Sequence, residues 1–133
     1  MAKYDIYWVV LHFADKPNIT ARKPVVQIKD NPEEKGAFAI ITSKGYKYKG
    51  KPHVINIDNL TGTGLWEPDS VIRYNRRLLN NPTKKKAGRL CKETIRAIEL
   101  HEAVSDVEIE YKMAEEFDDE FTITSMMTEA NDD

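Results

Sequence analysis

With 133 residues, the chain is long enough for one compact domain and too short for a large multidomain enzyme. Its 41% hydrophobic and 32% charged residues, with a formal net charge of -2, argue against both a disordered chain and a membrane protein. No apolar run approaches the roughly 20 residues of a membrane-spanning helix, and the N-terminal residues lack the pattern of a signal peptide, so we expect a cytoplasmic protein.

The first part of the chain predicts short strands separated by polar loops. Residues 4–11 are aromatic or β-branched at nearly every position, as in a strand buried on both sides, and residues 15–21 then predict a loop. The segment 44–51 alternates lysine with tyrosine and glycine, which predicts an exposed loop. Further strands are predicted at residues 25–28, 37–41, 53–57 and 70–74. Short strands at this spacing indicate a small closed or half-open β-barrel.

A helix follows late in the chain. Apolar residues recur at helical spacing from Ala87 to Ile98, which predicts an amphipathic helix. Gly88 weakens its first turn by about 1 kcal/mol relative to alanine, so we place the helix start near Lys92 and consider residues 84–90 as a last short strand. The predicted fold is therefore mainly β, with a C-terminal helix.

The chain divides into two regions of opposite charge. Residues 1–105 contain 19 lysines and arginines against 11 acidic residues, a balance of +8. Residues 106–133 contain one basic residue against 11 acidic ones, a balance of -10. The predicted domain therefore covers residues 1–105, and an acidic tail covers residues 106–133. Within the tail, residues 107–111 alternate as in a strand; such acidic and hydrophobic composition is typical of a disordered segment or of one that folds onto a basic partner.

Several kinds of chemical site are disfavoured. The three histidines are far apart in sequence, and there is no Cys-x-x-Cys or His-x-x-x-His pair, so we expect neither a metal nor a cofactor. Cys91 lies on the apolar face of the predicted helix, which favours an inert core thiol over a nucleophile. The Thr61-Gly62-Thr63-Gly64 segment lacks the lysine of a phosphate loop and predicts a turn.

Basic residues interleaved with aromatic ones are the remaining signal. They could neutralise phosphates and stack on unpaired bases, or they could form a solvated surface, and composition leaves both readings open. These residues are Lys44, Tyr46, Lys47, Tyr48, Lys49, Lys51, Arg73, Tyr74, Arg76 and Arg77.

The order of several segments carries more information than any one of them. They are Ile6-Tyr7-Trp8-Val9, Arg22-Lys23-Pro24-Val25-Val26, Ala39-Ile40-Ile41-Thr42-Ser43, Lys51-Pro52-His53-Val54, the run from Gly64 to Ile72, and Gly88-Arg89-Leu90. In this order the chain resembles the MazF/PemK family of toxins from type II toxin-antitoxin systems, across residues 4–104.

The resemblance implies a fold, an activity and partners. The fold would be a small SH3-like β-barrel with a C-terminal helix, assembled as a homodimer. The activity would be metal-independent cleavage of single-stranded messenger RNA, in which the ribose 2′-hydroxyl attacks the adjacent phosphate. An acidic antitoxin would inhibit the enzyme by covering the RNA-binding groove.

The resemblance also implies site residues. Arg22, Lys23 and Thr42 would carry the phosphate chemistry, with Lys23 in the position where the family usually has arginine. Asn75 occupies a position where some members have an acidic residue, and a neutral amide cannot take a proton. The RNA-binding residues would be Ser43, Lys44, Tyr46, Lys47, Lys49, Arg73 and Asn75. Trp8 and Trp66 are expected to fill the core or a dimer interface.

Two alternatives stay open. The first is a non-catalytic binding protein on the same barrel, either similar to the family's gyrase poisons or an inactive regulatory member. The second concerns the tail. We predict that residues 107–123 fold back over a basic groove lined by Arg22, Lys23, residues 44–51 and Arg73, and replace or mimic the antitoxin, against the alternative of a disordered tail.

Overall fold

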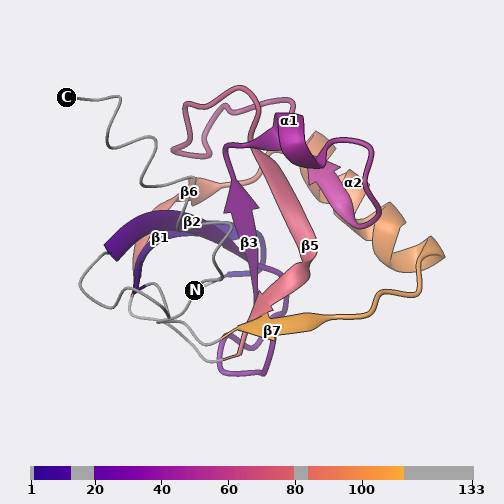
Figure 1. The fold of residues 1–133 in the computed structure, drawn as a ribbon, viewed down its shortest axis with the longest axis horizontal. Coiled ribbons are helices and arrows are strands. Elements are labelled where there is room, and N and C mark those ends of the chain that lie inside the picture. Colours follow the sequence, from indigo (N-terminus) through magenta and orange to yellow (C-terminus); the bar gives the residue numbers. More distant parts are fainter. Residues whose placement is uncertain (1, 13–19, 80–83, 113–133) are drawn as a thin grey trace.

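The structure is a computed structural model that describes residues 2–12, 20–79 and 84–112. This part of the chain is mainly β, with one curved sheet of seven strands and two helices (Figure 1). The strands are β1 (Asp5–His12), β2 (Thr20–Gln27), β3 (Phe38–Thr42), β4 (Val54–Asn56), β5 (Val71–Leu78), β6 (Lys84–Arg89) and β7 (Glu110–Lys112). The helices are α1 (Gly45–Tyr48) and α2 (Lys92–Val104).

The strands follow the order β4-β5-β3-β2-β1-β6 and are antiparallel, while β7 pairs with β5 in parallel. Within the described residues, the edge strands β4 and β6 do not pair with each other, so the sheet is not closed. The prediction of a mainly β fold is confirmed at this level.

Strand β3 lies at the centre of the core. All five of its residues are buried. Because successive residues of a strand face opposite sides of the sheet, Ile40 belongs to one hydrophobic cluster with Val9 and Val25, and Ile41 belongs to a second cluster with Ile6 and others. The near-continuous apolar run at residues 37–41 follows from this burial on both faces.

Strand β5 contains a bulge that arginine stabilises. It pairs with β3 at Arg73 and again at Arg77, and the residues between them leave the β3 ladder. The buried Arg77 guanidinium donates to the Tyr74 carbonyl at 2.6 Å and to the Gly36 carbonyl at 2.7 Å. These hydrogen bonds satisfy carbonyl groups that would otherwise be buried without partners.

Strand β7 covers the C-terminal half of β5. It pairs with Arg76, Arg77 and Leu78, and Glu110 forms an ion pair with Arg76 at 3.0 Å. The Tyr111 ring lies against Gly36, where a Cβ atom would clash with it. Residues 110–112 pair with the end of β5 that lies away from the pocket described below. Most of the predicted segment, residues 113–123, lies outside the described part, so its contact with the basic groove stays a prediction.

Helix α2 packs on β4 and β5 through apolar and polar contacts. Ile98 is fully buried in the second cluster. The rings of His53 and His101 meet edge to face, with His53 Nδ1 and His101 Nε2 3.2 Å apart. The Tyr74 hydroxyl donates to Glu102 at 2.6 Å, and burial, together with this bond, raises the pKa of Tyr74 to about 12.

Several sequence predictions need correction. Thr20 and Ala21, predicted in a loop, belong to β2, and β5 extends four residues beyond the predicted Tyr74 to Leu78. The segment 44–51 contains α1, in which Tyr48 is buried. Cys91 is the half-buried N-cap residue of α2, with its sulfur 3.3 Å from Thr94 Oγ1, so the expectation of a core thiol is wrong. The predicted helix start near Lys92 and the short strand at residues 84–90 are confirmed.

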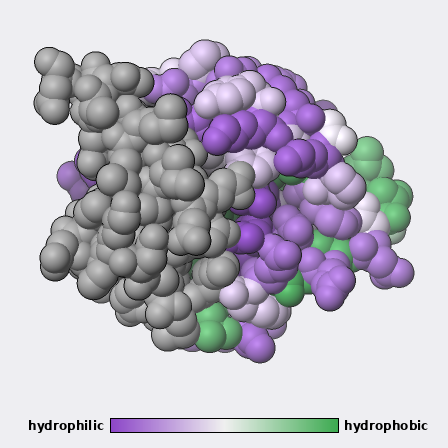
Figure 2. All heavy atoms as spheres, viewed as in Figure 1, coloured by the Kyte–Doolittle hydropathy of each residue, from purple (hydrophilic) through white to green (hydrophobic). Residues whose placement is uncertain are grey.

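On the face drawn in Figure 2, the described residues are largely hydrophilic, with hydrophobic patches on the side where α2 lies and at the lower edge. Leu100 and Val104 are the exposed large apolar residues of that helix. None of the helices in the described ranges is long and apolar enough to cross a membrane.

Replacing Gly45 with alanine tests the packing of α1. The added Cβ would clash with the backbone carbonyl of Asp69, which cannot rotate away, so we expect a loss of about 3 kcal/mol in the free energy of unfolding. Gly50→Ala is the matched control, because a Cβ there meets open space and the cost is the positive φ alone, about 1 kcal/mol. Urea denaturation followed by tryptophan fluorescence measures both; equal losses would contradict the proposed close contact.

The His53 and His101 pair predicts a pH dependence of stability. Burial, and next the charge of His53, lowers the pKa of His101 below its ordinary 6.5. The folded state therefore binds fewer protons than the unfolded state below pH 6.5, and the free energy of unfolding falls as the pH drops through that region. His101→Gln should reduce this fall, which urea midpoints at several pH values measure. An unchanged pH slope in the variant would show that other groups cause it.

Candidate functional site

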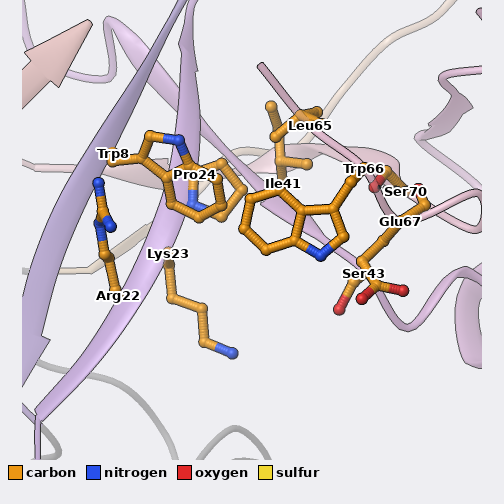
Figure 3. Close-up of a pocket in the computed structure, with 10 residues that line it drawn as sticks. All are labelled: Trp8, Arg22, Lys23, Pro24, Ile41, Ser43, Leu65, Trp66, Glu67 and Ser70. Atoms are coloured by element: carbon orange, nitrogen blue, oxygen red, sulfur yellow. Dashed lines mark hydrogen bonds between the residues drawn. The ribbon is translucent and has the colours of Figure 1, made fainter. Parts of the chain in front are cut away.

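A pocket of about 330 Å³ opens where strands β2 and β3 separate (Figure 3). The ladder between these strands begins at Val25 and Ile40, so the residues before Val25 and after Ile40 do not pair with each other. The pocket forms in the gap and is closed on another side by the loop between β4 and β5, residues 57–70. Its lining residues are Trp8, Arg22, Lys23, Pro24, Ile41, Ser43, Leu65, Trp66, Glu67 and Ser70.

Two tryptophans form the aromatic wall of the pocket. The Trp8 and Trp66 rings are stacked, with 5.5 Å between centroids and 27° between planes. The Arg22 guanidinium lies over the Trp8 ring at 5.1 Å, a cation-π contact. Trp66 is 70% exposed, so its expected placement in the core is wrong, while its placement at a dimer interface stays a prediction. A large exposed ring fixed by a second ring is a suitable surface for stacking a planar ligand.

Lys23 is the more buried of the two cations that line the pocket. Its backbone pairs with Val9, and in Figure 3 its side chain extends below the two indole rings. Burial lowers the pKa of Lys23, and the nearby charge of Lys44 lowers it further. An anion bound in the pocket would relieve both effects, because it would stabilise the charged ammonium.

Hydroxyl groups lie beside these cations. Ser43 lines the pocket directly after the end of β3. The preceding residue, Thr42, is 4% exposed, and its hydroxyl accepts a hydrogen bond from the Lys44 backbone N-H at 3.1 Å. Strands β2 and β3 no longer pair at this point. If their register continued, Thr42 would lie opposite Lys23, on the same face of the sheet. The charge of Lys44 acts on Lys23, but neither Thr42 nor Lys44 is among the residues that line the pocket.

The loop at residues 57–70 is fixed near the pocket by hydrogen bonds. Ser70 donates to the Glu67 carbonyl twice, from its backbone N-H at 3.1 Å and from its hydroxyl at 2.7 Å. Asp69 forms an ion pair with Lys49 at 3.1 Å, and its carbonyl contacts Gly45 of α1. Trp66 and Glu67 therefore sit on a turn that is held from both sides.

Other residues predicted for RNA binding lie outside the pocket lining. Tyr46 and Lys47 are exposed on α1, and Lys49 follows α1 and is exposed. The Arg73 guanidinium lies over the Tyr48 ring at 4.2 Å, on β5 beside β4. Asn75 lies in the bulge of β5. Arg22, Lys23 and Ser43 thus line the pocket, and Thr42 and Lys44 are the sequence neighbours of Ser43. The residues that do not line it are Tyr46, Lys47, Lys49, Arg73 and Asn75.

Sequence reasoning did not identify Leu65, Trp66, Glu67 and Ser70 as pocket residues. The available signal was Trp66, which is followed by glutamate and proline in a Gly-rich, polar loop. A large aromatic residue outside any strand is less often buried. Within residues 2–12, 20–79 and 84–112, no cluster of three histidine, cysteine or acidic side chains could hold a metal ion.

Comparisons with models of protein families, with curated proteins and with solved structures each found no match. The function of the chain is therefore inferred from the pocket and from the order of its sequence segments.

Proposed function

We propose that this protein binds single-stranded RNA in the pocket and cleaves it as a toxin-like, metal-independent endoribonuclease. The observation that carries the proposal is the exposed Trp66 ring, stacked on Trp8 and adjoining Arg22 and Lys23. The resemblance to the MazF/PemK family, drawn from the order of sequence segments, supports the same activity. In this proposal the curved sheet is a half-open form of an SH3-like barrel.

Binding would use stacking and charge together. An unstacked base would lie on the free face of Trp66, as in other proteins that bind single strands. The neighbouring phosphates would contact Arg22, Lys23 and Lys44, and the hydroxyl of Ser43 would donate to a phosphate oxygen. A double helix would fit poorly, because its bases are stacked on each other and cannot reach the tryptophan.

Cleavage would be a transesterification within the RNA. The 2′-oxygen forms a bond to phosphorus, the bond from phosphorus to the 5′-oxygen breaks, and the products are a 2′,3′-cyclic phosphate and a 5′-hydroxyl. The 2′-hydroxyl proton passes to solvent. Lys23 would protonate the leaving 5′-oxygen, since its lowered pKa makes the ammonium a stronger acid than an ordinary lysine. Arg22 and Ser43 would stabilise the negative charge on the phosphate.

The proposal includes the partners that the resemblance implies. A homodimer would present two such pockets, and an acidic antitoxin would compete with RNA for the same cations. The acidic tail at residues 106–133 is a second source of such a segment, because its balance of -10 opposes the +8 of the rest of the chain. Messenger RNA as substrate would place the activity in the cytoplasm.

Trp66→Ala tests the binding surface. Loss of one base-stacking ring should weaken the binding of an unstructured RNA oligonucleotide about tenfold or more, since each stacked base is worth roughly 1–3 kcal/mol. Fluorescence anisotropy with a labelled oligonucleotide measures the dissociation constant. Tyr46→Ala is the matched control, because Tyr46 is 65% exposed on α1 but does not line the pocket.

Two results would contradict the proposed surface. An equal loss in Tyr46→Ala would place the RNA on α1 rather than in the pocket. If Trp66→Ala instead dissociated a dimer in analytical ultracentrifugation and left RNA affinity unchanged, Trp66 would be an interface residue.

Lys23→Arg tests the proposed proton donor. Arginine keeps the positive charge but does not give up a proton near neutral pH, so RNA binding should persist while cleavage slows about 10²-fold or more. The exposed Lys92→Ala on α2 is the control and should leave both unchanged. A substrate with sulfur in place of the 5′-oxygen should restore cleavage by the variant, because a thiolate leaves without protonation.

Equal cleavage by wild type and Lys23→Arg would show that Lys23 provides charge alone. Cleavage of an RNA with a 2′-deoxy nucleotide at the cut position would exclude the transesterification. RNA binding by the wild type with no cleavage under any condition would favour the non-catalytic alternative, in which the same fold serves only as a binding protein.

A further inference from the structure

The carboxylate of Glu67 is the one acidic group among the pocket-lining residues. It faces a site whose other charged groups are Arg22 and Lys23, and it would repel a bound phosphate. A carboxylate in such a place lowers the affinity for the RNA backbone unless it contacts another part of the ligand. The position of Glu67 therefore requires an explanation other than contact with the RNA backbone.

Among the described residues, the Glu67 side chain makes no polar contact that would explain its position. Within the described part of the chain, no hydrogen bond or ion pair involves its carboxylate. Asp69, two residues later, gives the contrast, because it forms an ion pair with Lys49 at 3.1 Å. The backbone of Glu67 is nevertheless fixed, since its carbonyl accepts both hydrogen bonds from Ser70. The carboxylate is thus available to a ligand and is carried on an ordered turn.

The neighbour of Glu67 indicates which part of the ligand it would meet. Trp66 precedes it and offers the ring on which, in the proposed function, a base stacks. In Figure 3 the Glu67 carboxylate lies below the Trp66 indole, on the side of Trp66 away from Trp8. A base stacked on the free face of Trp66 would have its edge, rather than its phosphate, near this carboxylate.

We propose that Trp66 and Glu67 form a subsite for a guanine base, in which Glu67 accepts hydrogen bonds from the guanine Watson-Crick edge. This inference rests on the proposed function, because it concerns the same pocket and the same ligand. An ionised carboxylate can only accept hydrogen bonds. Guanine presents two adjacent donors, N1-H and the 2-amino group, which match the two carboxylate oxygens.

The other bases offer less to a carboxylate. Adenine and cytosine each present one amino group next to a ring nitrogen acceptor, which faces the second carboxylate oxygen unfavourably. Uracil presents a single N3-H between two carbonyl oxygens, both of which a carboxylate repels. The expected order of affinity is guanine first, adenine and cytosine next, and uracil last. Glu67 is a specificity-determining residue in this scheme and takes no part in the bond changes.

The test uses the full-length protein and seven-nucleotide RNAs of uridine with one variable central base. Every nucleotide carries a 2′-O-methyl group, so that none of the RNAs can be cleaved. Wild type should bind the guanine oligonucleotide about tenfold more tightly than the all-uridine one. Glu67→Gln should reduce this ratio to about twofold and should bind the uridine oligonucleotide more tightly, because the repulsive charge is gone.

Two controls make the interpretation specific. Glu99→Gln makes the same charge change at an exposed position of α2 and should keep the guanine preference of wild type. Inosine lacks the 2-amino group of guanine and removes one of the two donors. Replacing guanine with inosine should therefore weaken binding to wild type severalfold and have little effect on Glu67→Gln.

The possible failures are distinguishable. If no RNA binds, or if Trp66→Ala binds as well as wild type, the proposed function is wrong. If binding depends on Trp66 but all four bases bind equally, or if Glu67→Gln keeps the guanine preference, the guanine subsite is wrong and RNA binding stands. If Glu67→Gln keeps the preference and loses only cleavage, Glu67 acts in the chemistry and the specificity role is overturned.

Discussion

The burial of β3 on both faces is the constraint on which the rest of the structure depends. Ile40 and Ile41 serve two separate hydrophobic clusters, so a shift of β3 by one residue would move each side chain to the opposite face and disrupt the packing of both clusters. This fixes the end of the strand at Thr42, where the apolar run stops and Ser43 and Lys44 begin. The pocket opens at this point, because the ladder with β2 does not extend past Ile40 and Val25. Core packing therefore determines where the polar residues gather.

The elements that were predicted well are those whose sequence pattern reflects local burial. Strand β3 and the start of α2 follow directly from apolar runs and helical spacing. The second half of β5 was missed because its two arginines look solvent-exposed in sequence. The structure buries them instead, with Arg77 bonded to carbonyls of Tyr74 and Gly36, which are partners that only the tertiary fold supplies. The burial of Tyr48 in α1 depends in the same way on distant contacts, including the Arg73 guanidinium over its ring.

The residues of the candidate site could also be predicted only in part. Arg22, Lys23 and Ser43 could be selected from the order of segments along the chain, and all three line the pocket. The selection also included Arg73 because of its charge, and sequence gave no way to see that its guanidinium is held over Tyr48. The sequence does not identify Glu67 as a pocket residue, because one acidic residue in a polar loop is unremarkable until its position among cations is known.

The charges of the pocket explain why a ligand would be bound there at all. Lys23 is held where burial and the charge of Lys44 disfavour its protonated form. Arrangements of this kind lower stability and recur at functional sites, since a bound anion removes the cost. Glu67 has the opposite sign and would disfavour the same anion. A ligand that suits both Lys23 and Glu67 must carry a negative group and, a few ångströms away, a pair of hydrogen-bond donors. These donors must belong to a flat surface that can stack on Trp66. A nucleotide with a guanine base has all three features, whereas free phosphate has one and an acidic peptide lacks the flat donor edge.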